Sequence, residues 1–217
     1  MVWMLSGLTD IPDMCLYDDV TGVILAGGRG KRMGSVDKGL QLLNGKPMVE
    51  HVIERLRPQV STLVISANRN PEAYAAFGYP VCADEPLAYS GPLAGFLTGL
   101  RHCQTLYLVT APCDVPFLSR RLVEDLHRSL TEKEADLSVA VSRIDEYCQV
   151  QPVFCLMKAS LAPHLEKFLE NGGRRIEEWY ATLNVATVCF DDRQAFENVN
   201  TPEELERLQN RSGNEIE

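Results

Sequence analysis

The residues best suited to chemistry lie in a glycine-rich, basic loop near the start of the chain. Three glycines stand within four positions, and four cations fall between Arg29 and Lys38. Glycine lets the backbone approach a ligand closely, and backbone N–H groups and cationic side chains together bind highly charged anions. Because the whole chain has a formal charge of −9, this local excess of positive charge is informative. The loop predicts a site for a polyphosphate such as a nucleoside triphosphate.

Two common phosphate-binding motifs do not fit this loop. The P-loop requires Lys directly before Ser or Thr, whereas Ser35 follows Gly34. The dinucleotide-binding motif G-x-G-x-x-G fits Gly28 and Gly30 but has Met33 at its third glycine position. The loop instead reads L-A-G-G-x-G-x-R-M-G, followed four residues later by lysine. A plain strand-to-helix turn with solvated cations is the alternative.

Asp114 is the residue expected to bind a metal ion. It lies between two nearby prolines, directly after a strongly apolar run, so the edge of a sheet would hold it rigidly. Mg²⁺ commonly takes one or two protein carboxylates and completes its shell with water and phosphate oxygens. A turn or capping role is the alternative, although Ser119 is itself a good cap for the following helix. With Lys38 and Arg32 neutralising phosphate charge, Asp114 predicts chemistry at phosphorus.

Other polar or small residues follow the second and third predicted strands. Ser66 and Asn68 come after the second strand. Asp84 follows the third and has three interpretations: its carboxylate could accept from the N1–H and N2–H₂ groups of guanine, hold a ribose hydroxyl, or simply end a strand. Gly91 precedes a predicted helix and could let the backbone approach a ligand.

Two further candidates lie near the C-terminus. Asn198 and Asn200 stand just before the last predicted helix, where they could reach a metal or phosphates, or satisfy local backbone groups. Arg174 and Arg175 follow two glycines and form a second basic turn, suited to another phosphate or to a plain surface turn.

Apolar runs alternate with helix-like segments along the chain, which predicts an α/β fold with a mostly parallel central sheet. Ligands of such sheets bind beyond the carboxyl ends of the strands, where the residues above fall. Strands are expected at 20–25, 40–43, 63–67, 79–82, 106–110, 137–141, 150–156 and 184–190. Helices are expected at 47–56, 92–103, 119–130, 161–169 and from residue 202, the last preceded by a capping box beginning at Thr201.

Length and composition limit the class of protein. The 217 residues suffice for one domain with a sizeable core, expected at 20–217. Residues 1–19 contain four Asp and no Lys or Arg, which is the wrong polarity for a secretory signal, and we expect a poorly ordered extension. The acidic balance argues against nucleic acid, and no apolar run approaches the roughly 18 residues of a membrane span. Seven scattered cysteines without a C-x-x-C pair favour a cytoplasmic protein with reduced thiols.

Taken together, the motifs resemble those of the molybdenum cofactor guanylyltransferases. The resemblance runs from Thr21 to Leu208 and rests on L-A-G-G-x-G-x-R-M-G-x-x-D-K-G, S-A-N-R, G-P-L-A-G, A-P-C-D-x-P and N-V-N-T-P-E-E-L. It implies a three-layer, Rossmann-like nucleotidyltransferase fold. It also implies Mg²⁺-dependent transfer of GMP from GTP to the terminal phosphate of Mo-molybdopterin, with pyrophosphate released. Residues 20–143 are expected to bind the nucleotide and residues 144–217 the molybdopterin, the latter near Arg174 and Arg175.

The resemblance also assigns roles to single residues. Lys38 would meet the phosphates, Asp84 the nucleoside, and Asp114 both Mg²⁺ and GTP. The main chain that would hold the nucleotide comprises Leu25, Ala26, Gly27 and Gly28. Two positions depart from the patterns of relatives. Ser66 stands where the family often has Asn and offers fewer hydrogen bonds, and Asn200 stands where many relatives outside the family have Asp, which suggests one protein carboxylate for the metal.

Several functions remain open at this point. A molybdopterin cytidylyltransferase or an enzyme that loads a sugar or alcohol phosphate would use the same chemistry. A non-catalytic nucleotide-binding regulator would keep the site and transfer nothing. The expected partners are GTP and Mo-molybdopterin, with transient contacts to other molybdenum cofactor biosynthesis proteins or acceptor molybdoenzymes as a further expectation, and neither nucleic acid nor membrane.

Overall fold

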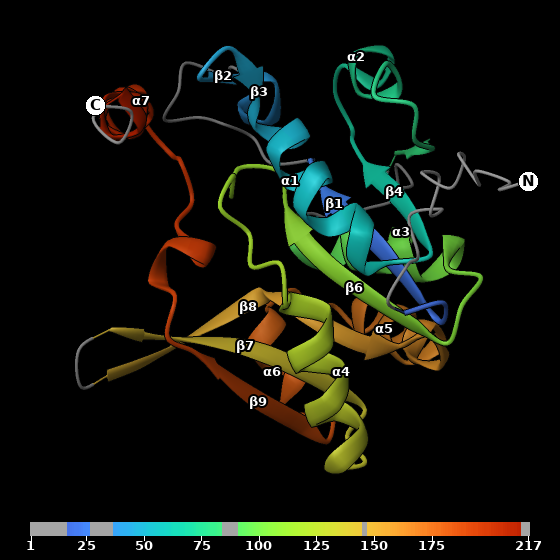
Figure 1. The fold of residues 1–217 in the computed structure, drawn as a ribbon. Helices are drawn as coiled ribbons and strands as arrows, with labels where there is room; N and C mark the ends of the chain where they lie inside the picture. The colour runs from blue at the N-terminus through green and yellow to red at the C-terminus, as the bar shows by residue number, and fades with distance from the viewer. Residues whose placement is uncertain (1–16, 27–36, 84–90, 145–146, 214–217) are drawn as a thin grey trace, which may run out of the picture.

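A seven-stranded sheet forms the centre of the fold (Figure 1). The computed structural model describes residues 17–26, 37–83, 91–144 and 147–213. Neighbouring strands are parallel except at the fifth strand of the sheet, which is antiparallel to both its neighbours. In order across the sheet the strands are β5 (Val81–Cys82), β4 (Thr62–Ser66), β1 (Val20–Leu25), β6 (Tyr107–Pro112), β8 (Tyr147–Lys158), β7 (Leu137–Ile144) and β9 (Val185–Phe190).

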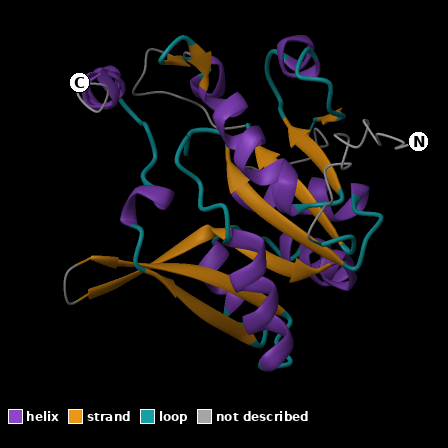
Figure 2. Cartoon of the chain, in the orientation of Figure 1, coloured by secondary structure: helices purple, strands orange, loops and turns teal. Residues whose placement is uncertain are grey.

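Helices cover both faces of the sheet and give the molecule three layers (Figure 1, Figure 2). One face carries α1 (Met48–Leu56) and α4 (Leu122–Glu132), and the other carries α3 (Pro92–His102), α5 (Ala162–Glu170) and α6 (Ile176–Tyr180). Each face has its own hydrophobic core, and alternate residues of β1 serve the two, since strand side chains point to opposite faces in turn. The predicted three-layer α/β fold with a mostly parallel sheet is confirmed.

A separate hairpin and several short helices complete the fold. The strands β2 (Leu42–Leu43) and β3 (Lys46–Pro47) form a separate hairpin, and α7 (Pro202–Gly213) packs beside it through a third apolar cluster. That cluster contains Leu43, Met48, Val199 and Leu208. The remaining short helices are α2 (Pro71–Ala75), η2 (Lys38–Leu40), η3 (Arg57–Gln59), η4 (Ala159–Leu161) and η5 (Arg193–Phe196). Among the described residues, no helix has the length and apolar character that a membrane span requires.

Most predicted elements are confirmed within a few residues, and the strand expected at 40–43 needs correction. It joins neither β1 nor an edge of the main sheet, because residues 38–40 form the helix η2 and only Leu42–Leu43 pairs, with β3. The turn between β2 and β3 has Asn44 at φ 52° and Gly45 at φ 78°, the positive angles that a tight two-residue hairpin requires. The short helices α2 and α6 are not among the predicted elements.

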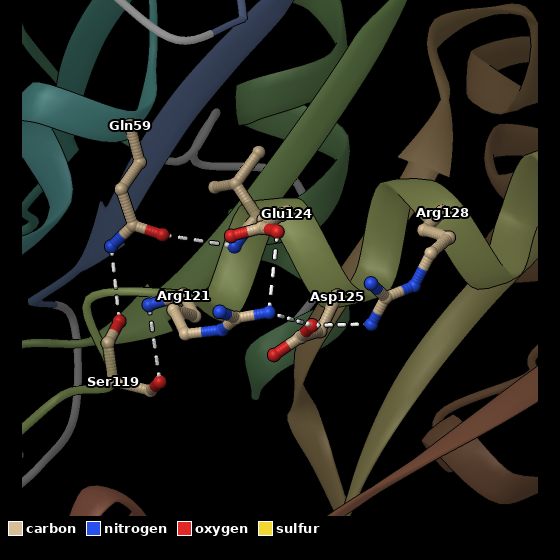
Figure 3. Close-up of polar contacts among 7 residues, drawn as sticks. Gln59, Ser119, Arg121, Glu124, Asp125 and Arg128 are labelled. Atoms are coloured by element: carbon tan, nitrogen blue, oxygen red, sulfur yellow. Dashed lines mark hydrogen bonds and ion pairs between the residues drawn. The ribbon is translucent and has the colours of Figure 1, made fainter.

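The start of α4 also differs from the prediction, because its first turn is capped from a distant part of the chain (Figure 3). Gln59 is buried, and its Oε1 accepts from the N–H of Val123 at 3.0 Å. Its Nε2 donates to the carbonyl oxygens of Ser119 at 3.0 Å and Arg55 at 2.7 Å. Ser119 Oγ accepts from the N–H of Arg121 at 3.2 Å. Ser119 therefore closes a turn ahead of the helix and does not cap it.

The structure describes residues on both sides of each predicted boundary, which lie between residues 19 and 20 and between residues 143 and 144. Residues 1–16 lie outside the described residues, whereas Tyr17 lies against the domain with its ring 5.0 Å from that of His127, and the carbonyl of Asp19 accepts from the N–H of Tyr107 at 3.0 Å. Residues 144–149 include the end of β7 and the start of β8, which pair in the same sheet. The assignment of nucleotide and molybdopterin binding to the two sides of residue 144 stays a prediction.

Close packing of α3 on the sheet depends on a glycine. A Cβ atom added at Gly99 would lie 2.8 Å from Val23 Cγ2 and 3.1 Å from Leu108 Cδ2. Val23 lies in β1 and Leu108 in β6, and both are fully buried. The absent side chain thus lets the helix backbone approach the two strands that run toward the candidate site.

We predict that Gly99→Ala destabilises the protein by about 1–3 kcal/mol, because the new methyl group overpacks a dense core. The free energy of unfolding from urea denaturation measures the change. The Val23→Ala background is the matched control, since it removes the nearest obstructing methyl groups. The same loss in both backgrounds would contradict the packing explanation.

Candidate active site

Lys38 joins three segments that are far apart in the sequence. Its Nζ donates to Asp114 Oδ2 at 3.0 Å and to Asn200 Oδ1 at 2.6 Å. The three residues come from η2, from the segment after β6, and from the segment before α7. The side chains of Lys38 and Asp114 are only 21% and 12% exposed, so solvent screens this ion pair less than a surface pair. The structure thus brings together three residues predicted for the site.

The sheet topology explains why this point forms. β1 lies between β4 and β6 and is parallel to both, so the chain leaves β1 toward one side and returns on the other. Ligands of open α/β sheets bind beyond the carboxyl ends of the strands where the chain changes direction in this way. Asp114 comes two residues after β6. The N–H of its neighbour Cys113 donates to the carbonyl of Leu25, the last residue of β1, at 3.1 Å.

Asn200 reaches the site because the backbone on both sides of it is fixed. The carbonyl of Asp114 accepts from the N–H of Val199 at 2.9 Å. The Oε2 of Glu204 accepts from the N–H groups of Asn200 at 2.7 Å and Thr201 at 3.1 Å, and Thr201 Oγ1 accepts from the N–H of Glu204 at 3.1 Å. This reciprocal pair is the predicted capping box, which is confirmed. It ties the start of α7 to the residue that holds Lys38.

Asn198 lies two residues before Asn200, and its described contact with the site is made by its backbone. Its side chain is exposed, and its carbonyl accepts from Asn200 Nδ2 at 3.3 Å. That bond orients the Asn200 amide so that its oxygen points to Lys38. Asn198 therefore acts on the described site through its backbone.

The predicted nucleotide-binding residues after β1 and β4 already make backbone bonds. The carbonyl of Leu25 accepts from Cys113, as described above, and the N–H of Ala26 donates to the carbonyl of Ser66 at 2.7 Å. Ser66 is 2% exposed, whereas Asn68 is exposed at the same edge. Gly27, Gly28, Arg32 and Asp84 lie outside the described residues, and the contacts expected of them stay predictions.

Gly91 stands at the start of α3 in a conformation that favours glycine. Its φ of 97° and ψ of −176° are rarely adopted by residues with a side chain, and a Cβ atom there would meet nothing within 4 Å. The backbone angle, not a lack of space, is therefore what requires glycine at this position.

The second basic turn has its own local role in the structure. Arg174 Nη1 donates to the carbonyl of Leu169 at 2.8 Å, near the C-terminal end of α5, and to the carbonyl of Gly173 at 2.6 Å. Arg175 precedes α6, and its exposed side chain lies 3.6 Å from Glu178. A phosphate role for this turn stays a prediction.

Comparison with known proteins identifies the family. Residues 22–185 match the model of the MobA-like NTP transferase domain. A molybdenum cofactor guanylyltransferase of Cupriavidus necator is 52% identical over 194 residues, which cover 88% of this chain and 97% of the relative. The chain belongs to the molybdenum cofactor guanylyltransferase family. Another member of this guanylyltransferase family, from Ralstonia pickettii, is 50% identical over 198 residues, covering 89% of this chain and 97% of the relative.

One solved structure agrees with membership of the guanylyltransferase family, and a second shares the fold. The structure of molybdopterin-guanine dinucleotide biosynthesis protein A from Archaeoglobus fulgidus has a TM-score of 0.70 and 25% identity, and the match covers 89% of this chain and 99% of that one. A CMP:2-keto-3-deoxy-manno-octonic acid synthetase complexed with CTP has a TM-score of 0.67 at 14% identity, covering 91% of this chain and 98% of that chain. The second likeness shows the nucleotidyltransferase fold alone.

We predict that Thr201→Ala loosens the first turn of α7, because it removes the hydroxyl that accepts from Glu204. Loss of such a cap costs about 1 kcal/mol, so the backbone amide of Glu204 should exchange with solvent about fivefold faster. Thr201→Ser is the matched control because it keeps the hydroxyl. Equal exchange in the Ala and Ser variants would contradict a capping role for the Thr201 side chain.

Proposed function

We propose that this chain transfers GMP from GTP to the terminal phosphate of Mo-molybdopterin, forming molybdopterin guanine dinucleotide and releasing pyrophosphate. Relatives of about half identical sequence that are named molybdenum cofactor guanylyltransferases support the proposal. The structural observation that carries it is the Lys38 ammonium between Asp114 and Asn200, at the edge of the sheet where nucleotides bind in open α/β folds.

The donor set around Lys38 fits Mg²⁺. A carboxylate oxygen of Asp114 and an amide oxygen of Asn200 already lie around one cation, the lysine ammonium. Mg²⁺ prefers such oxygen ligands and takes few of them from the protein. We propose that Asp114 holds Mg²⁺ with Asn200 as a second oxygen donor, so that only one protein carboxylate is used. When bound, Mg²⁺ would neutralise charge on the phosphate oxygens of GTP.

The chain itself contributes position and charge to the proposed reaction. A terminal phosphate oxygen of molybdopterin attacks the α-phosphorus of GTP in line, a new P–O bond forms, and the bond to pyrophosphate breaks without a covalent enzyme intermediate. Negative charge grows on the departing pyrophosphate, and the Lys38 ammonium stabilises it. Arg32 has the same proposed role from the loop after β1. Lys38 can do this only if a phosphate oxygen replaces part of its bond to Asp114.

Nucleotide choice separates the proposed function from its rivals. A molybdopterin cytidylyltransferase or a sugar-phosphate nucleotidyltransferase would use the same Lys38 and Asp114 chemistry. We propose that Asp84 selects guanine, with Ser66 and Asn68 beside the nucleoside. Release of pyrophosphate with GTP, and with no other nucleoside triphosphate, in the presence of Mo-molybdopterin would support this; release with CTP instead would support the cytidylyltransferase. Stabilisation by GTP without product would support a regulator.

We further propose that the protein works in the cytoplasm, in transient contact with other molybdenum cofactor biosynthesis proteins or with acceptor molybdoenzymes. All six described cysteines are free thiols, which supports a reducing compartment.

Lys38→Ala and Asp114→Ala are each predicted to lower turnover at least about 10²-fold, because the first removes a cation that stabilises the phosphate charge and the second removes the carboxylate proposed to hold Mg²⁺. Pyrophosphate release from GTP with Mo-molybdopterin measures the rate, and circular dichroism checks the fold. Lys46→Ala is the matched control, since Lys46 is a more exposed lysine paired with Glu54. Native rates in both site variants would contradict the mechanism.

Removal of divalent cations with EDTA is predicted to abolish pyrophosphate release, and added Mg²⁺ is predicted to restore it. The rate at graded Mg²⁺ concentrations measures the requirement in native protein and in Asn200→Ala. If Asn200 is a metal donor, the variant needs more Mg²⁺ for half-maximal rate. An unchanged Mg²⁺ requirement in the variant would limit the proposed metal site to Asp114.

A further inference from the structure

We propose that Tyr74 is a positioning residue for Lys38: its hydroxyl, together with the side chain of Asn70, fixes Asp37 and so holds the neighbouring lysine against Asp114 and Asn200. The inference rests on the proposed function for the role of Lys38. Tyr74 and Asn70 belong to none of the motifs that relate this chain to its family, and no catalytic contact is assigned to them above.

Both carboxylate oxygens of Asp37 are held by the same short helix. Tyr74 Oη donates to Asp37 Oδ1 at 2.5 Å, and Asn70 Nδ2 donates to Asp37 Oδ2 at 3.0 Å. Tyr74 lies in α2, and Asn70 directly precedes it. Asp37 is also the residue that precedes η2, whose first residue is Lys38. Because both carboxylate oxygens of Asp37 accept hydrogen bonds, the start of η2 has little freedom to move.

The buried position of Tyr74 makes its hydroxyl a dependable donor. The side chain is fully buried, and a buried tyrosine hydroxyl needs a partner. Burial, with the neighbouring Cys113 and Asp37 groups, raises the pKa of Tyr74 far above its ordinary value. The hydroxyl therefore keeps its proton at neutral pH, and it donates to Asp37.

The Tyr74 hydroxyl lies between the segment that carries Lys38 and the segment that carries Asp114. A Cβ atom added at Gly39 would lie 2.5 Å from Tyr74 Oη and 3.1 Å from both Cβ and Sγ of Cys113. Cys113 directly precedes Asp114, just as Asp37 directly precedes Lys38. Glycine at position 39 thus leaves the space through which the Tyr74 hydroxyl reaches both backbone segments. One phenol packs against the residue before the lysine and the residue before its carboxylate partner.

The backbone of Asn70 agrees with a specialised role for this helix. Asn70 has φ 47° and ψ 42°, a left-handed conformation that costs energy for most residues but that Asn tolerates. Its carbonyl accepts from the N–H groups of Ala73 and Tyr74 at 3.0 and 3.2 Å. This turn begins α2 shortly after β4, on the same side of the sheet as Lys38. The side chain of Tyr74 then lies in the core.

The test compares Tyr74→Phe with Tyr180→Phe in steady-state pyrophosphate release from GTP and Mo-molybdopterin. Tyr180 is the matched control: it is a buried tyrosine on the other face of the sheet, and its hydroxyl donates to the carbonyl of Pro152 at 2.7 Å. Each variant loses one buried hydrogen bond, so both should lower Tm by about 2–4 °C. Only Tyr74→Phe should lower kcat, about tenfold, with KM for GTP changed less than about twofold, because a misplaced Lys38 loses contacts that strengthen in the transition state.

A second comparison tests whether Tyr74 acts through Asp37. Asp37→Asn removes the charge that Tyr74 holds, and the double variant with Tyr74→Phe should have nearly the same kcat as Asp37→Asn alone. Independent, multiplied losses would overturn the proposal, as would a kcat of Tyr74→Phe equal to that of Tyr180→Phe.

Crystal structures of native protein and Tyr74→Phe test the positioning apart from the reaction. The proposal expects Lys38 Nζ to leave Asp114 and Asn200 in the variant, and unchanged positions of Asp37 and Lys38 would overturn it. If native protein releases no pyrophosphate from GTP and Mo-molybdopterin, the proposed function fails, while these two structures still decide whether Tyr74 positions Lys38.

Discussion

The site depends on one cation held by two oxygens, the Lys38 ammonium between Asp114 and Asn200. A partly buried carboxylate without a partner would be costly, and the ammonium offsets that cost. The pair is therefore a structural contact as well as a chemical one. It joins the segment after β6 to η2 and to the segment before α7. Gly39, Gly99 and the capping box of α7 help to place the backbone of these segments.

In the proposed function, the same pair of charges sets the conditions for nucleotide binding. A phosphate oxygen that recruits Lys38 competes with two oxygens already at hydrogen-bonding distance. In the proposed function, triphosphate and Mg²⁺ together would meet this competition better than either alone, because Asp114 would hold the metal while Lys38 would bind the phosphate. A site of this kind exchanges partners without leaving either charge unpaired in the interior.

Sequence patterns were sufficient for much of the fold, and they picked out Lys38, Asp114 and Asn200, which the structure brings together. Strand Val20–Leu25 and the capping box at Thr201 follow from local signals, namely a short apolar run and the spacing of Thr and Glu. The late start of α4 does not follow from a local signal, because the capping side chain, Gln59, is 64 residues away from Val123. Tyr74 was missed for the same reason, since an apolar-looking aromatic residue in a five-residue helix carries no sign of its partner Asp37.

The C-terminal origin of Asn200 has a consequence for synthesis of the chain. A nascent chain that has released residues 20–144 from the ribosome contains β1, β6, Lys38 and Asp114, yet it lacks β8, the strand that pairs with β6 on its outer side. The amide that completes the lysine's contacts belongs to Asn200, which follows β9 and so emerges later than all seven strands of the sheet. Full assembly of the site therefore requires that every strand of the central sheet has already been synthesised.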